Sequence, residues 1–86
     1  MEREREPLSE LSAVERAVGA KQVRRAVQDR RAVRVYLACD ADPAVTEPLE
    51  ALSREYGVPV ETAYTMRQIG KACGIAVGAS AAAALE

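Results

Sequence analysis

The run Val33–Ala38, with the sequence VRVYLA, constrains the fold more than any other feature of this 86-residue chain. It is apolar at every position except Arg34, which is typical of a central strand that is covered on both faces. A strand of this kind lies in a sheet between two layers of helices. A chain of this length holds one core, so the sequence predicts a single α/β domain.

Apolar residues at helical spacing predict four helices around this strand. The first ends at Gly19 and has its apolar face at Leu8, Leu11, Val14 and Val18. Capping residues mark two other boundaries. Asp42 as N-cap before Pro43 starts one helix, and a capping box of Thr65 and Gln68 starts another. The expected helices span residues 8–18, 21–30, 43–56 and 66–73.

Two further strands are predicted from residues 58–63 and 79–85. Val58–Ala63 is predicted to form a strand, and Pro59 suggests the beginning of that strand or a sheet edge. Five alanines in Ala79–Leu85 favour a helix by propensity, but the position of this segment after a βαβα pattern favours a strand. The order α-(β)-α-β-α-β-α-β then predicts a three-layer α/β/α sandwich with a small mixed four-stranded sheet. Residues 1–6 are expected to be a disordered tail, and residues 7–86 the domain.

The charges are polarised along the chain, although the net charge is only −1. Residues 15–34 carry seven basic and two acidic side chains, whereas residues 35–63 carry six acidic side chains and one basic. A segregated basic surface suits an anionic partner. The alternative is an ordinary solvated helix face.

Several classes of function are disfavoured. The chain has no histidine, and Cys39 and Cys73 lack CxxC spacing, so neither a metal site nor a cofactor is expected. Cys73 has no base to activate it, and we interpret both cysteines as small buried hydrophobic residues. Gly70 and Lys71 lie within a predicted helix, which does not fit a P-loop. We therefore do not expect an enzyme.

The hydropathy of the chain and its first residues predict where the protein resides. No apolar run approaches the roughly 18 residues of a membrane span. The start MEREREP does not resemble a secretion signal. We expect a cytoplasmic protein.

Three separated segments could converge at one end of such a sandwich. The second helix places Lys21 in its first turn, where a cation costs about 0.3–1 kcal/mol against the helix dipole. The strand-to-helix corner contributes Asp42, and the loop Gly74–Gly78 contributes exposed aliphatic side chains. Donors at a helix start beside an apolar surface suit RNA, whose phosphates accept hydrogen bonds and whose splayed bases need a surface to pack on.

The sequences GAKQVRRAV, LACDADP and IGKACGIAVG, at these distances, resemble the kink-turn RNA-binding ribosomal proteins of the archaeal L7Ae type. The similarity covers about residues 8–85 and is greatest to the short bacterial, ribosome-associated members. It implies a monomeric α/β/α sandwich that clamps a kink-turn, an RNA bend flanked by tandem sheared G·A pairs. Lys21 and Gln22 would face those pairs, Gly19 would let the backbones approach, and Arg25 would contact the RNA one turn further along.

The resemblance also implies roles for the other two segments. Asp42 would lie beside the extruded nucleotide of the bend. Ile75, Ala76 and Val77 would form a hydrophobic wall against it, with Lys71 near a phosphate. The bound molecule would be ribosomal RNA or a structured non-coding RNA, and the ribosome a partner. Two alternatives stay open: a protein-interaction adaptor on the same fold, and a small nucleotide-binding enzyme.

Overall fold

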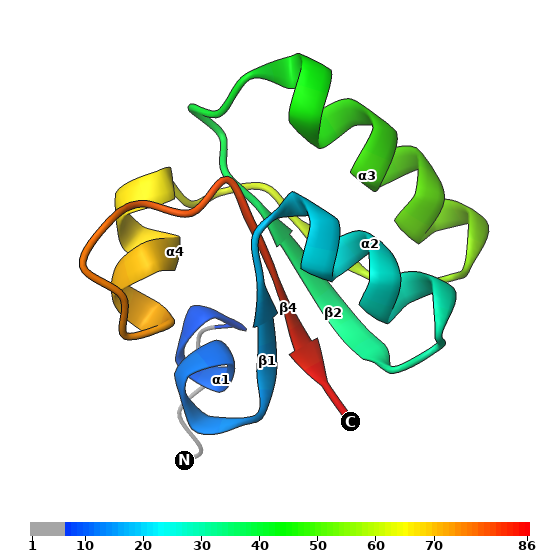
Figure 1. Cartoon of the computed structure of the whole chain (residues 1–86), viewed down its shortest axis with the longest axis horizontal. Coiled ribbons are helices and arrows are strands. Elements are labelled where there is room, and N and C mark those ends of the chain that lie inside the picture. The colour runs from blue at the N-terminus through cyan, green and yellow to red at the C-terminus, as the bar shows by residue number, and fades with distance from the viewer. Residues whose placement is uncertain (1–6) are drawn as a thin grey trace, which may run out of the picture.

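A computed structural model of the chain describes residues 7–86, in which helices and short strands alternate (Figure 1). The predicted tail, residues 1–6, lies outside the described residues. The elements are α1 (Pro7–Ala13), β1 (Arg16–Val18), α2 (Ala20–Gln28), β2 (Ala32–Leu37), α3 (Pro43–Glu55), β3 (Val60–Glu61), α4 (Met66–Ala72) and β4 (Ala81–Leu85).

The strands form the predicted mixed four-stranded sheet, in the order β1-β4-β2-β3. Strand β4 is antiparallel to both β1 and β2, whereas β3 is parallel to β2. The predicted strand at residues 58–63 is reduced to the two residues of β3. It lies at the sheet edge, and Val35 N donates to the Pro59 carbonyl at 2.9 Å, in keeping with the position expected for that proline.

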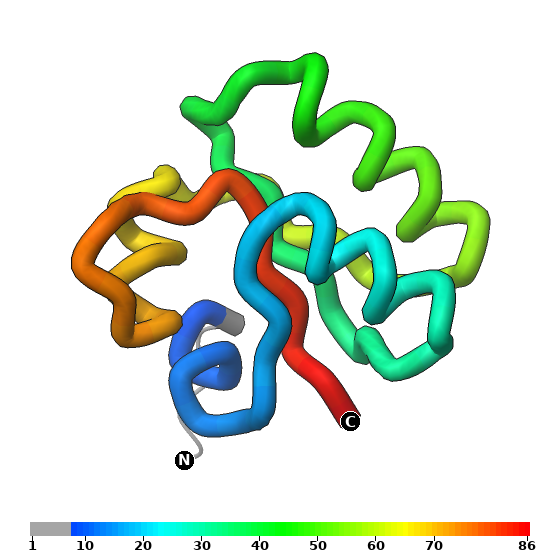
Figure 2. The backbone as a smooth tube through the Cα atoms, viewed as in Figure 1, coloured from blue at the N-terminus to red at the C-terminus, as the bar shows by residue number. Residues whose placement is uncertain are grey.

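Helices cover both faces of the sheet and confirm the three-layer α/β/α architecture (Figures 1 and 2). Helices α2 and α3 pack on one face, and α1 and α4 on the other. The alanines of β4 alternate between the two cores: Ala81 and Ala83 face α2 and α3, while Ala82 and Ala84 face α1 and α4. Their small side chains are fully buried between two helical layers, which explains why an alanine-rich segment is a strand here.

The first predicted helix is wrong in its second half. Residues 16–18 form β1, which pairs with β4, instead of the last turns of a helix. The Arg16 guanidinium donates to the Val14 and Cys73 carbonyls at 3.1 and 3.2 Å, holding the turn after α1 against the end of α4. Val14, in the turn after α1, and Val18, in β1, still pack on the core beneath α1 and α4, so their apolar character does not require a helix.

Two smaller predictions also need correction. Cys39 is exposed, whereas Cys73 is buried as predicted. Cys39 follows the end of β2, and its backbone N–H donates to the Tyr64 carbonyl at 2.8 Å while its side chain faces outward. Helix α2 ends two residues before Arg30, which adopts the left-handed φ of 59° and therefore cannot continue the helix.

Candidate nucleic-acid interface

Backbone hydrogen bonds hold two of the predicted segments, the start of α2 and the corner after β2, against the beginning of β4, the strand that follows the apolar loop. Gly19 N donates to the Ala81 carbonyl and Ala38 N donates to the Ser80 carbonyl, both at 2.9 Å. The ends of β1 and β2 are therefore tied to the beginning of β4. In Figure 1 the start of α2, the corner between β2 and α3, and the chain entering β4 lie together at the upper end of the sheet.

The start of α2 exposes backbone donors without a side-chain cap. Gly19 has φ 97° and ψ 153°, a conformation that favours glycine, and no side chain caps the helix. No acidic residue lies in the first turn. The opposite face is buried through valines and an alanine, which fixes the outward face in place. On that outward face, the side chains border a shallow hollow, which is lined by Lys21, Gln22, Arg24, Arg25 and Gln28.

The basic run at residues 15–34 does not form one uniform surface. Arg31 pairs with Glu15 at 3.6 Å, and the Arg30 guanidinium lies 5.0 Å from the centre of the Tyr56 ring. These arginines are already engaged by neighbouring side chains. Cation–π and exposed ion-pair contacts are weak, but they orient both guanidinium groups toward the protein.

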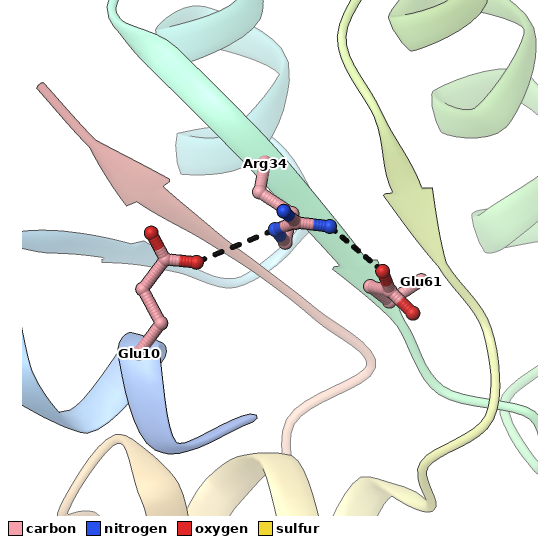
Figure 3. A network of polar contacts seen from close by, with 3 residues as sticks. All are labelled: Glu10, Arg34 and Glu61. Atoms are coloured by element: carbon pink, nitrogen blue, oxygen red, sulfur yellow. Dashed lines mark hydrogen bonds and ion pairs between the residues drawn. The ribbon is translucent and has the colours of Figure 1, made fainter. Parts of the chain in front are cut away.

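Arg34 is more firmly engaged, as Figure 3 shows. Its Nη1 lies 2.8 Å from Glu61 Oε2, and its Nε lies 3.3 Å from Glu10 Oε1, an ion pair without the alignment of a hydrogen bond. Arg16 binds backbone carbonyls, as described above. Among residues 7–86, the cations of the run without an ion-pair, hydrogen-bond or ring partner are therefore Lys21, Arg24 and Arg25.

The loop between α4 and β4 presents apolar side chains on a firmly held backbone. Val77 is 70% exposed and Ile75 is 37% exposed, and Ala76 between them is also exposed. Ile75 N donates to the Gly70 carbonyl at 3.1 Å. Figure 2 shows the loop running back alongside α4 before it enters β4. A Cβ on Gly70 would collide with the Val77 carbonyl oxygen, so the loop packs directly on the helix backbone.

The corner between β2 and α3 contains two aspartates with different partners. Asp42 is the N-cap of α3, and its Oδ1 accepts from Ala44 N at 3.0 Å, as predicted. Asp40 Oδ1 accepts from Met66 N at 2.8 Å and so joins this corner to the start of α4. The N-terminus of α4 is further fixed by the predicted capping box of Thr65 and Gln68.

The buried titratable groups do not support covalent or acid–base chemistry. Burial raises the pKa of Tyr36 to about 12, with Glu10 adding to the rise. Burial also raises the pKa of the Cys73 thiol, although the nearby Arg16 acts in the opposite direction. A buried thiol that stays protonated is a poor nucleophile. Among residues 7–86, no three His, Cys, Asp or Glu side chains are grouped so that they could hold a metal ion. In the same part of the chain, none of the helices has the length and hydropathy of a membrane span.

Residues 10–86 match the family described as ribosomal protein L7Ae/L30e/S12e/Gadd45. The chain belongs to the L7Ae family. It is 41% identical over 76 residues to the RNA-binding protein YbxF of Geobacillus stearothermophilus, covering 88% of this chain and 93% of that protein. It is 37% identical, with the same coverage, to an RNA-binding protein of Caldanaerobacter subterraneus.

Solved structures of the same fold agree with this L7Ae-family architecture. The 15.5 kDa RNA-binding protein of Giardia lamblia superposes with a TM-score of 0.86 at 24% identity, covering 92% of this chain and 70% of that one. A protein of unknown function from Bacillus halodurans superposes with a TM-score of 0.82 at 24% identity, covering 92% of this chain and 83% of the other. At such identity the likeness concerns the fold.

Three residues that shape or border the candidate interface were not predicted from the sequence. Asp40 tethers the corner to α4, Gly70 admits the apolar loop, and Arg67 borders the same hollow as Lys71. A glycine inside an amphipathic helix was a signal for close backbone approach, since glycine is otherwise unfavourable there. The role of Asp40 depends on a contact between residues 26 positions apart, for which the sequence holds no local signal.

Proposed function

We propose that this protein binds RNA at the sheet end formed by the start of α2, the β2–α3 corner and the apolar loop before β4, and that it recognises kink-turns. The observation that carries the proposal is the combination of three partner-free cations, Lys21, Arg24 and Arg25, on a helix whose first turn is uncapped. Such a surface suits phosphates and the acceptor edges of bases. The names of the bacterial relatives support an RNA partner.

The position of Lys21 explains how α2 would recognise a particular RNA structure. A lysine ammonium can donate to O6 and N7 of guanine, the commonest specific contact to that base edge. A regular RNA helix has a major groove too narrow for such a contact, whereas a kinked segment with sheared G·A pairs exposes the edge. Gln22 would lie beside it, and Arg25 would contact the RNA one turn further along. The unfavourable position of Lys21 in the helix dipole is offset when an electronegative partner docks there.

The apolar loop supplies the second half of the proposed interface. A base that leaves the stack of a bent RNA needs an apolar surface to cover it. Ile75, Ala76 and Val77 offer one, and its backbone is held by the contact with Gly70. Asp42 would lie beside that nucleotide while it caps α3.

The test is a titration of the wild-type protein with a kink-turn RNA and with a plain duplex of equal length at physiological salt. We expect much tighter binding to the kink-turn, because the proposed contacts depend on exposed guanine edges and an extruded base. Equal affinity for the two RNAs would contradict the proposal. Binding to neither would favour a protein-interaction role on this fold.

The cellular partner would be ribosomal RNA or a structured non-coding RNA, with the protein acting as a cytoplasmic monomer. Crosslinking in cells followed by sequencing of the bound RNA identifies that partner directly. Recovered sequences that form kink-turns would support the proposal. Recovery of RNA without such bends would argue against it.

A further inference from the structure

Helix α4 carries two cations, Arg67 and Lys71, one turn apart on its exposed surface. Both border a hollow whose other wall is the loop at residues 75–78. Within residues 7–86, neither cation has a carboxylate within ion-pair distance. The hollow therefore combines positive charge on one side with exposed aliphatic side chains on the other.

The positions of these two cations are unfavourable for α4 when no anion is bound. Like charges four residues apart on a helix repel each other. Arg67 also lies in the first turn of α4, where the helix dipole disfavours a cation, and that turn has no acidic residue. Lys21 occupies the same unfavourable place on α2. An anion that docks beside both cations removes the repulsion on α4.

The spacing between the cations and the loop is fixed by the surrounding contacts. The capping box of Thr65 and Gln68 and the bond from Met66 N to Asp40 hold the first turn of α4. The missing side chain of Gly70, which lies between the two cations in the sequence, lets the loop pack against the helix backbone. These contacts hold both walls of the hollow in place in the folded protein.

We propose that Arg67 and Lys71 together bind one backbone phosphate of the RNA, at the nucleotide whose base packs on Ile75 and Val77. A nucleotide has an apolar base face next to a charged phosphate. The apolar loop can cover the base while the two neighbouring cations bind the phosphate. The planar guanidinium of Arg67 can bind two phosphate oxygens at once, while the ammonium of Lys71 acts as a point charge. This inference rests on the proposed function and adds Arg67 to the interface.

The test uses Arg67→Gln and Lys71→Gln, titrated with a kink-turn RNA at several salt concentrations. Each variant should bind about three- to tenfold more weakly at low salt. Each should also reduce the slope of log affinity against log salt, but by less than the roughly 0.7–0.9 of a whole lost phosphate contact, because the other cation still contacts the same phosphate. Arg67→Lys keeps the charge and should retain most of the slope. Arg54→Gln is the matched control, since Arg54 is an exposed arginine on α3 that pairs with Glu50.

A second RNA, which lacks the extruded nucleotide, localises the contact. On this RNA, Arg67→Gln should bind as tightly as the wild type, because the phosphate is gone. Wild-type affinity and slope for Arg67→Gln on the intact kink-turn would overturn the inference. So would an equal loss on both RNAs, or a loss no larger than that of Arg54→Gln. Failure of the wild type to prefer the kink-turn would instead overturn the proposed function.

Discussion

Replacing Gly70 with alanine tests whether the apolar loop must pack on α4 for the protein to bind RNA. A Cβ at this position would collide with the Val77 carbonyl oxygen and would lie 3.0 Å from Gly78 Cα and 3.1 Å from Val77 C. All three atoms belong to the backbone, so no side-chain rotation can relieve the contact. The loop must move away from the helix, and the hydrogen bond from Ile75 N to the Gly70 carbonyl must lengthen or break.

The stability change is the difference between two opposing effects. Alanine is favoured over glycine inside a helix by about 0.8–1 kcal/mol. Overpacking a closely fitted site costs about 1–3 kcal/mol. The free energy of unfolding should therefore fall by about 1 kcal/mol, which lowers the melting temperature by roughly 4–8 °C for a domain of this size. The affinity for a kink-turn RNA should fall at least about tenfold, because Val77 moves out of contact with the base.

Thermal melts and RNA titrations of Gly70→Ala and Gly57→Ala separate these effects. Gly57 has a φ of 72° and no atom within 4 Å of an added Cβ, so alanine there is strained without displacing a neighbour. The strain costs about 1–2 kcal/mol, and the position after α3 lies away from the proposed interface. Gly57→Ala should lose stability but not RNA affinity. A Gly70→Ala protein with raised stability and unchanged affinity would refute the reasoning.

Three further outcomes are expected. Val77→Asp should weaken kink-turn binding while leaving the melting temperature nearly unchanged, because Val77 is 70% exposed; a large drop in melting temperature would show it to be part of the core. In a urea titration, Arg16→Gln should lower the free energy of unfolding by about 2–3 kcal/mol, because the hydrogen bonds of Arg16 to the Val14 and Cys73 carbonyls are lost. Arg24→Gln should lower it by almost nothing in the same measurement. The raised pKa of Tyr36, about 12, means that the folded state keeps a proton that the unfolded state loses near pH 10. The contribution of Tyr36 to stability should therefore be fully present below pH 10 and fall by about 2–3 kcal/mol as the pH rises to 12. Tyr36→Phe should remove this part of the alkaline slope, leaving the part that comes from the raised pKa of the Cys73 thiol.

The layers and most elements could be predicted because their signals are local. The run Val33–Ala38 indicated a strand buried on both faces, which is correct for Val35, Tyr36 and Leu37, whereas Val33 is 40% exposed. The caps at Asp42 and Thr65 marked the starts of α3 and α4. The last strand needed a topological argument, since the propensity of its alanines favours a helix. The first helix was extended too far because Val14 and Val18 pack on the core from a turn and a strand, as they would from a helix.

The site was harder to predict, because its composition depends on contacts between distant residues. The sequence showed seven cations in residues 15–34 but not which of them were already engaged. Arg34 pairs with Glu61, 27 positions away, and Arg16 bonds to Cys73, 57 positions away. Those contacts remove both arginines from the exposed basic surface. The fit of the apolar loop on Gly70 is likewise visible only once the chain is folded.

The most direct test of the account is a double-mutant cycle between Lys21 and the sheared G·A pairs. Wild type and Lys21→Ala are titrated against a kink-turn RNA and against the same RNA with Watson–Crick pairs in place of the G·A pairs. Lys21→Ala should lose about 1–3 kcal/mol of binding free energy on the intact kink-turn and little on the altered RNA, because the guanine edge is exposed only in the first. Its stability should not fall, since alanine is the better helix former. Equal weakening on both RNAs, with a salt slope lower by about one unit, would show that Lys21 contributes only charge and would contradict the claim that α2 recognises the kink-turn.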